Sequence, residues 1–84
     1  MGFFKLATWN VNSIRIRLDL LKKLSELEQP DIICLQEVKS KEEDFPFDAV
    51  RMLGYPHIAL YGMSGYNGVA ILSITVLNNV EKQD

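Results

Sequence analysis

The sequence predicts a small α/β domain built on a strand–helix–strand unit. Residues 3–9 form a short apolar run with aromatic side chains, which is typical of a strand. Residues 14–28 carry apolar side chains at helical spacing, and residues 32–35 form a continuous apolar run of the kind found in buried strands. A strand, a helix and a second strand in this order predict two parallel neighbouring strands joined by a helical crossover.

The helix expected over residues 14–28 has the clearest pattern in the chain. Ser13 is the expected N-cap, because its hydroxyl can accept a hydrogen bond from a free backbone N–H of the first turn. Pro30 ends the helix, since the residue before a proline is displaced from helical geometry. The expected core-facing stripe consists of Ile14, Leu18, Leu21, Leu24 and Leu27.

After residue 30 the sequence predicts several more strands, and the predicted helices are too few to cover both faces of the resulting sheet. The expected elements are a strand within residues 31–38, a solvated loop at 40–44, a short helix at 45–53 with Phe47, Val50 and Leu53 inward, strands at 57–62 and 69–72, and a weak strand with a polar tail at 74–84. Asn67-Gly68 favours a tight hairpin turn. One sheet face is expected to be bare, which indicates a missing layer or a partner chain that covers it.

Composition narrows the class of protein. A chain of 84 residues allows one domain, and a net charge of −2 excludes a strongly basic protein that coats nucleic acid. Contacts to a few phosphates through placed residues remain compatible with this charge. Cys34 is the only cysteine, and one buried thiol fits a reducing compartment. No apolar run approaches the roughly 20 residues that span a bilayer, so we expect a cytoplasmic protein with no membrane partner.

Two polar side chains are expected to meet at one edge of the sheet. Asn10 follows the first predicted strand and Glu37 follows the second. Because neighbouring parallel strands end at the same edge, both should face one crevice, where a carboxylate and an amide oxygen suit a hard cation such as Mg²⁺. Arg15, expected in the first helical turn, could contact a phosphate. The structural alternatives are a turn asparagine, a charged strand exit and a solvated helix arginine.

A second candidate is the glycine-rich segment at residues 62–68. Glycines let the backbone approach a ligand closely, and Tyr66 could stack on a base or enter a groove. The alternative is a flexible hairpin. His57 is the only histidine, which excludes a histidine zinc cluster and favours a strand residue over a catalytic base. Cys34, inside an apolar run, is expected to be inert core.

Three motifs in series, LATWNVNSIR, PDIICLQEVK and GYNGVAILS, resemble the endonuclease/exonuclease/phosphatase superfamily. Within it the nearest likeness is to the exonuclease III branch of abasic-site endonucleases, over roughly residues 5–73. The resemblance implies the N-terminal part of a four-layer α/β sandwich, with the second sheet missing, which would explain the bare face. It also implies Mg²⁺-dependent hydrolysis of DNA phosphodiesters in base excision repair; the oxygen ligands alone would also suit Mn²⁺. The implied partner is double-stranded DNA with abasic sites or 3′ ends.

The resemblance also assigns roles by matching position. It implies that Glu37 is the main metal carboxylate and that Asn10 lies in the same catalytic metal site, where it orients metal or phosphate. Asn12 takes the place of a second polar residue, which is Asp in some relatives. Contacts to DNA are implied for Asn12, Arg15 and the loop Gly65-Tyr66-Asn67.

The resemblance ends abruptly after Ser73. The further Tyr, the Asp-x-Asn pair and the late Asp-His pair of the family have no counterpart there. We therefore divide the chain into the N-terminal portion of the family domain, residues 1–73, and a divergent polar tail, residues 74–84, and expect the isolated chain to be inactive. Two alternatives stay open: a non-catalytic module completed by a partner, and a phosphodiesterase of the same superfamily that acts on a non-DNA substrate.

Overall fold

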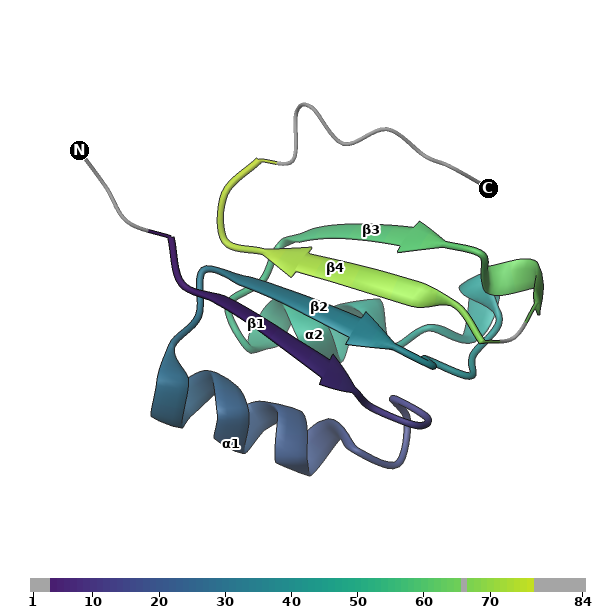
Figure 1. Ribbon diagram of the computed structural model, residues 1–84, viewed down its shortest axis with the longest axis horizontal. Helices are drawn as coiled ribbons and strands as arrows, with labels where there is room; N and C mark the ends of the chain where they lie inside the picture. The colour runs from purple at the N-terminus through teal and green to yellow at the C-terminus, as the bar shows by residue number, and fades with distance from the viewer. Residues whose placement is uncertain (1–3, 66, 77–84) are drawn as a thin grey trace.

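The computed structural model describes residues 4–65 and 67–76. In this part of the chain a four-stranded sheet is accompanied by two α-helices (Figure 1). The strands are β1 (Leu6–Asn10), β2 (Ile32–Gln36), β3 (His57–Tyr61) and β4 (Val69–Ser73), and the helices are α1 (Leu18–Glu28) and α2 (Phe47–Met52), with short 3-10 helices η1 (Glu42–Asp44) and η2 (Met63–Gly65). Within the described ranges, neither α-helix is long and apolar enough to cross a membrane.

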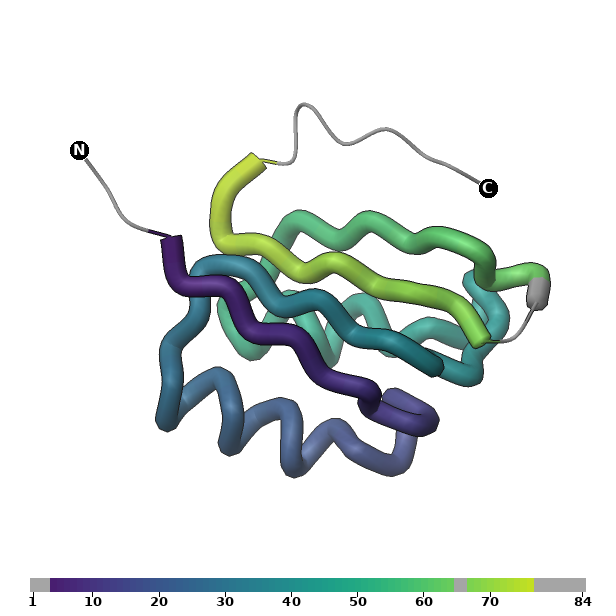
Figure 2. Tube along the Cα trace, in the orientation of Figure 1, coloured from purple at the N-terminus to yellow at the C-terminus, as the bar shows by residue number. Residues whose placement is uncertain are grey.

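The sheet order is β1-β2-β4-β3, as the tube in Figure 2 lets the reader follow. β1 and β2 are parallel, whereas β4 pairs antiparallel with both β2 and β3. The prediction of a strand–helix–strand unit followed by a hairpin is therefore confirmed. Its physical basis is that the helical crossover returns the chain to the same sheet edge, which makes the two flanking strands parallel.

One face of the sheet carries the core. Successive residues of a strand point to opposite faces, and burial alternates along β2 and along β4 as far as Leu72, after which Ser73 is buried too. The helices pack on this face, since Leu21 of α1 and Val50 of α2 belong to the same buried cluster as Ile33, Leu35 and Leu72. Phe47 and Leu53 pack against that cluster, so the predicted inward face of the short helix is confirmed, although α2 itself is shorter than residues 45–53.

The opposite face of the sheet is open within the described residues. One row across the four strands consists of Thr8, Cys34, Ile71 and Ala59, which are register partners of one another. Thr8 is exposed and the other three are partly exposed. The expected bare face is therefore observed, and Cys34 lies on it, so the expectation that Cys34 is a core residue is wrong, while the expected inertness of its thiol stays a prediction. A continuous apolar run in the sequence does not show whether one or both faces of the strand are covered by the rest of the chain.

Helix α1 begins later than its sequence pattern predicts. Arg17, not Ser13, is its N-cap, and Ser13 has a left-handed φ of 85°. The reason is long-range pairing: the N–H of Ser13 donates to the carbonyl of Glu37 at 2.9 Å, and the N–H of Ile14 donates to the carbonyl of Val38 at 3.0 Å. These bonds hold the segment beside β2, so the helix starts only after a turn closed by Arg17 N–H and Ile14 O at 3.0 Å.

Leu27 does not belong to the core stripe. Its side chain is 81% exposed, whereas Leu21 is fully buried. A helix turns about 100° per residue, so a strict three-residue spacing slips by about 60° at each step. Leu18 and Leu24 lie on either side of Leu21 and pack against the core, but Leu27 has rotated about 120° away from it.

The connection between β3 and β4 is longer than a tight hairpin. Residues 62–68 join the strands and include η2, so Asn67-Gly68 does not form the expected two-residue turn. Gly68 instead permits close packing: a Cβ built there would lie 2.3 Å from the Met63 sulfur and 2.9 Å from the Tyr61 carbonyl oxygen. Residues 74–76 form no strand, and the rest of the expected polar tail lies outside the described residues.

Candidate active site

The candidate site lies where β1 and β2 end at the same edge of the sheet. Asn10 and Gln36 are register partners at the last position of the two parallel strands. The pairing then continues past both strands, since the N–H of Val11 donates to the Gln36 carbonyl at 2.9 Å and the N–H of Ser13 donates to the Glu37 carbonyl at 2.9 Å. The two exit segments therefore run side by side, and their side chains meet.

Asn10 and Glu37 are in direct contact. The Nδ2 of Asn10 donates a hydrogen bond to the Oε2 of Glu37 at 2.5 Å. This contact uses the Nδ2 of the Asn10 amide, so its Oδ1 keeps the acceptor capacity that a cation ligand needs. Glu37 is half-buried and Asn10 is exposed, which leaves the pair open to a ligand. The expectation that strand pairing brings these residues together is confirmed, while their roles stay predictions.

A second contact, between Lys39 and Asn12, lies on the same two exit segments. The Nζ of Lys39 donates to the Oδ1 of Asn12 at 2.6 Å. Lys39 is not among the site residues that the sequence predicts. The only sequence signal was its position two residues after Glu37, which places it on the exit segment of the strand that carries the candidate carboxylate.

The two exit segments share an unusual backbone conformation. Asn12, Ser13, Glu37 and Lys39 all have left-handed φ values, of 47°, 85°, 54° and 52°. This region favours glycine, and a residue with a side chain there costs of order 1–3 kcal/mol. Four such residues in two paired segments must be held by the surrounding structure. Strain of this kind gathers at functional sites, which supports a functional interpretation of the edge.

The donor set fits a hard divalent cation in part. Glu37 offers carboxylate oxygen and Asn10 offers amide oxygen, the ligand types that Mg²⁺ and Mn²⁺ prefer. Residues 4–65 and 67–76 contain no group of three or more His, Cys, Asp or Glu side chains that could hold a metal. Within this part of the chain, the pair can therefore supply two oxygen ligands and leaves most of a coordination sphere to water, substrate or other protein groups.

The residues predicted to contact DNA do not all lie where the sequence placed them. Arg15 is exposed but lies in the turn before α1, not in the first helical turn as expected, because long-range pairing delays the helix. Gly68, just before β4, reaches the same sheet edge, since the N–H of Val38 donates to the Gly68 carbonyl at 2.9 Å. Asn67 is exposed and Gly65 ends η2, whereas Tyr66 lies outside the described residues.

His57 lies at the far end of the sheet from Asn10. It is the register partner of Ser73, which pairs with Ile32, which in turn pairs with Leu6 at the start of β1. Four residues of strand, about 13 Å at 3.3 Å per residue, separate this row from the Asn10 row. The expectation that His57 is a strand residue is confirmed, and its place in the register keeps it from acting on a group held at Glu37.

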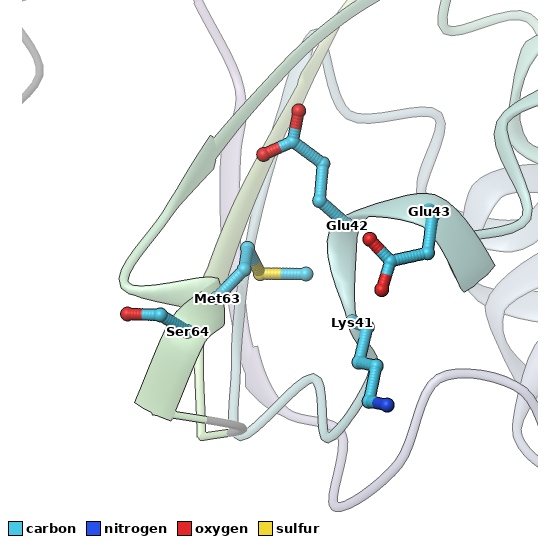
Figure 3. A pocket seen from close by; sticks show the side chains of 5 residues that line it. All are labelled: Lys41, Glu42, Glu43, Met63 and Ser64. Carbon is cyan, nitrogen blue, oxygen red and sulfur yellow. The ribbon is translucent and has the colours of Figure 1, made fainter.

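A separate hollow of about 510 Å³ lies between η2 and the start of η1 with the preceding Lys41 (Figure 3). Its lining residues are Lys41, Glu42, Glu43, Met63 and Ser64. Figure 3 shows Ser64 pointing away from Lys41, Glu42 and Glu43. Lys41 offsets only one of the two glutamate charges, and the small remaining negative charge favours no particular class of ligand.

Comparison with known proteins connects this chain to one family pattern and to several named nucleases. The Endonuclease/Exonuclease/phosphatase family pattern matches residues 7–73. Exodeoxyribonuclease III of Haemophilus influenzae is 41% identical over 69 residues, which is 82% of this chain and 26% of that protein. DNA repair nuclease APEX1 of Danio rerio is 40% identical over 84 residues, covering 90% of this chain and 26% of that protein.

Solved structures agree with these sequence matches. The 3′ phosphatase NExo from Neisseria, bound to a product DNA hairpin, has a TM-score of 0.83 at 42% identity. An AP endonuclease from Archaeoglobus fulgidus has a TM-score of 0.83 at 40% identity. Each comparison covers 94% of this chain and 30% of the other, so the chain spans less than a third of the length of these relatives. By sequence pattern, by identity and by fold, this chain belongs to the endonuclease/exonuclease/phosphatase family.

Proposed function

We propose that this chain contributes the Asn10/Glu37 part of a divalent-cation site in a DNA-repair phosphodiester hydrolase of the exonuclease III type. The observation that carries the proposal is the hydrogen bond from Asn10 Nδ2 to Glu37 Oε2 at the end of two parallel strands. The family membership and the names of the relatives support the reaction class. The proposed substrate is double-stranded DNA with abasic sites or 3′ ends, and the proposed cation is Mg²⁺ or Mn²⁺.

The residues divide the work as their chemistry suggests. A bound cation supplies charge neutralisation for a phosphoryl group under attack. Glu37 would hold that cation through its carboxylate, and Asn10 would orient the carboxylate through the Nδ2 hydrogen bond while offering its own Oδ1. Asn12, Arg15 and the Gly65-Tyr66-Asn67 loop are proposed to contact the DNA backbone.

Substitution of Glu37 by Gln tests the cation site. The change keeps the size of the side chain but removes its charge, so we expect the chain to lose binding of Mn²⁺ at this edge. The measurement is paramagnetic broadening of backbone amide signals by Mn²⁺, which should be greatest near Asn10 and Glu37. Glu26→Gln is the matched control, because Glu26 is an exposed glutamate of α1. Broadening that is equal in Glu37→Gln and the unaltered chain would refute the site.

The isolated chain is expected to be inactive as a nuclease. The site edge offers two oxygen ligands and no histidine, so the attacking water has no positioned general base. The absence of such a base lowers a reaction rate by about 10²–10⁴-fold. The measurement is incision of a duplex that contains one abasic site, with Mg²⁺ present. Incision that disappears in Glu37→Gln would contradict the expected inactivity while supporting the site.

The open sheet face supports a second candidate function. Cys34 and Ile71 are partly exposed on it, and apolar sheet faces of this kind mark interaction sites. Under this interpretation the chain is a non-catalytic module completed by a partner that covers the face. A monomer that melts cooperatively would count against it, because such a chain would need no partner to fold.

A further inference from the structure

We propose that Lys39 is a phosphate ligand of the same sheet edge, and that Asn12 holds it there without neutralising its charge. The proposal rests on the proposed function, because it names how the site would bind the anionic part of its substrate. It adds a residue to which neither the sequence motifs nor the expected cation assigned a role.

The first step is the geometry of the contact. Lys39 Nζ donates to Asn12 Oδ1 at 2.6 Å, across the two segments that leave β2 and β1. An ammonium group carries three donors, so one is used by Asn12 and two remain for an anion. Lys39 takes part in neither of the ion pairs found among the described residues, which are Lys5–Glu28 and Arg51–Asp48. Its charge is therefore held in place but not offset by this partner.

The second step is the backbone on which the two side chains stand. Asn12 and Lys39 have left-handed φ values of 47° and 52°. Asparagine adopts this region readily through its short polar side chain, whereas a lysine there carries a strain that glycine would avoid, and a hydrogen bond joins the two side chains. A contact that serves only to close the turn would not require a cation. A positioned ammonium group accounts for the lysine in left-handed backbone and for the hydrogen bond that fixes its side chain.

The third step is the position of Lys39 relative to the candidate cation site. It lies two residues after Glu37 on the same exit segment, and Asn12 lies two residues after Asn10 on the other. The two contacts therefore join the same pair of exit segments, and under the proposal one phosphate group meets both the ammonium and a cation held at the Asn10/Glu37 pair. A lysine acts as a point charge toward phosphate and does not require the planar geometry of an arginine.

The test measures binding of a short fluorescent DNA duplex to the full chain by anisotropy, with EDTA present to remove metal ions. We expect Lys39→Gln to weaken binding about tenfold, since a hydrogen bond to a charged group is of that size. We also expect the slope of log Kd against log salt to fall by about one. Asn12→Asp should weaken binding as well, because a carboxylate in contact with Nζ neutralises the charge while keeping the hydrogen bond.

Lys23→Gln is the matched control, because Lys23 is an exposed lysine of α1 and its loss changes the net charge equally. Circular dichroism melts of all variants serve to check that the fold is kept. The proposal is overturned if Lys39→Gln weakens binding no more than Lys23→Gln, if Asn12→Asp has no effect, or if the unaltered chain does not bind the duplex.

The metal-free assay separates this proposal from the proposed cation site. Binding that depends on Lys39, together with Mn²⁺ broadening that does not depend on Glu37, refutes the cation site alone. Broadening that depends on Glu37, together with duplex binding that is indifferent to Lys39, refutes the lysine proposal alone.

Discussion

At the scale of single residues, Tyr55 shows how one buried polar group joins distant parts of the chain. Its side chain is 2% exposed, and its hydroxyl donates to the carbonyl of Pro30 at 2.6 Å. Asp31, the next residue, accepts the backbone N–H of Lys5 through Oδ2 at 2.8 Å. Burial raises the pKa of Tyr55 above its usual value, and the charge of Asp31 raises this pKa further.

Tyr55→Phe tests this arrangement. A raised pKa in the folded state stabilises the chain below the unfolded pKa of about 10, and this stabilisation is lost as the pH rises through the folded pKa. At neutral pH the variant should lose about 1–3 kcal/mol of the free energy of unfolding, because the buried Pro30 carbonyl is left unpaired. The gap between variant and unaltered chain should then narrow in alkaline solution, as urea titrations at neutral and alkaline pH would measure.

Tyr61→Phe serves as the control for this experiment. The Tyr61 hydroxyl is buried and has no hydrogen-bond partner among the residues that the structure describes, so its removal should cost little at neutral pH. A gap for Tyr55→Phe that stays constant up to alkaline pH would contradict the assigned cause of the pKa shift.

At the scale of elements, α1 separates the buried from the exposed leucines of one apolar pattern. Leu21→Ala should cost about 2–5 kcal/mol of the free energy of unfolding, because it leaves a cavity at a fully buried position. Leu27→Ala should cost less than about 0.5 kcal/mol, since Leu27 is 81% exposed. Urea unfolding measures both, and equal losses would show that the sequence stripe describes the core better than the structure does.

The elements also show how far sequence reasoning reaches. The apolar run of β2 and the strand–helix–strand order depend on neighbouring residues, so they could be predicted, and with them the meeting of Asn10 and Glu37. The start of α1 could not, because Ser13 N–H is bonded to a carbonyl of Glu37, far along the chain. The Lys39–Asn12 contact could not be predicted either. It depends on left-handed backbone at both residues, and neither residue is a glycine that would have indicated this conformation in the sequence.

At the scale of the whole molecule, the sheet is covered on one face only in the described part of the chain. We expect the chain to self-associate through the open face at micromolar concentration, because partly exposed apolar side chains such as Ile71 lie on it. Ile71→Thr should raise the monomer fraction measured by sedimentation velocity. Met52→Thr removes a side chain that is 88% exposed on α2 and should leave the monomer fraction unchanged. Equal effects of the two changes would refute the role of the open face.

The contact between Asn10 and Glu37 spans 27 positions of sequence and exists only when β1 and β2 are paired. A ligand that recognises this pair of side chains must therefore bind the folded chain and not the unfolded chain. By mass action such a ligand raises the free energy of unfolding by RT ln(1 + [L]/Kd), about 2.7 kcal/mol at one hundred times Kd. The melting temperature of the chain, measured at increasing ligand concentration, therefore reports the binding of that ligand to the site. This measurement needs no turnover of substrate.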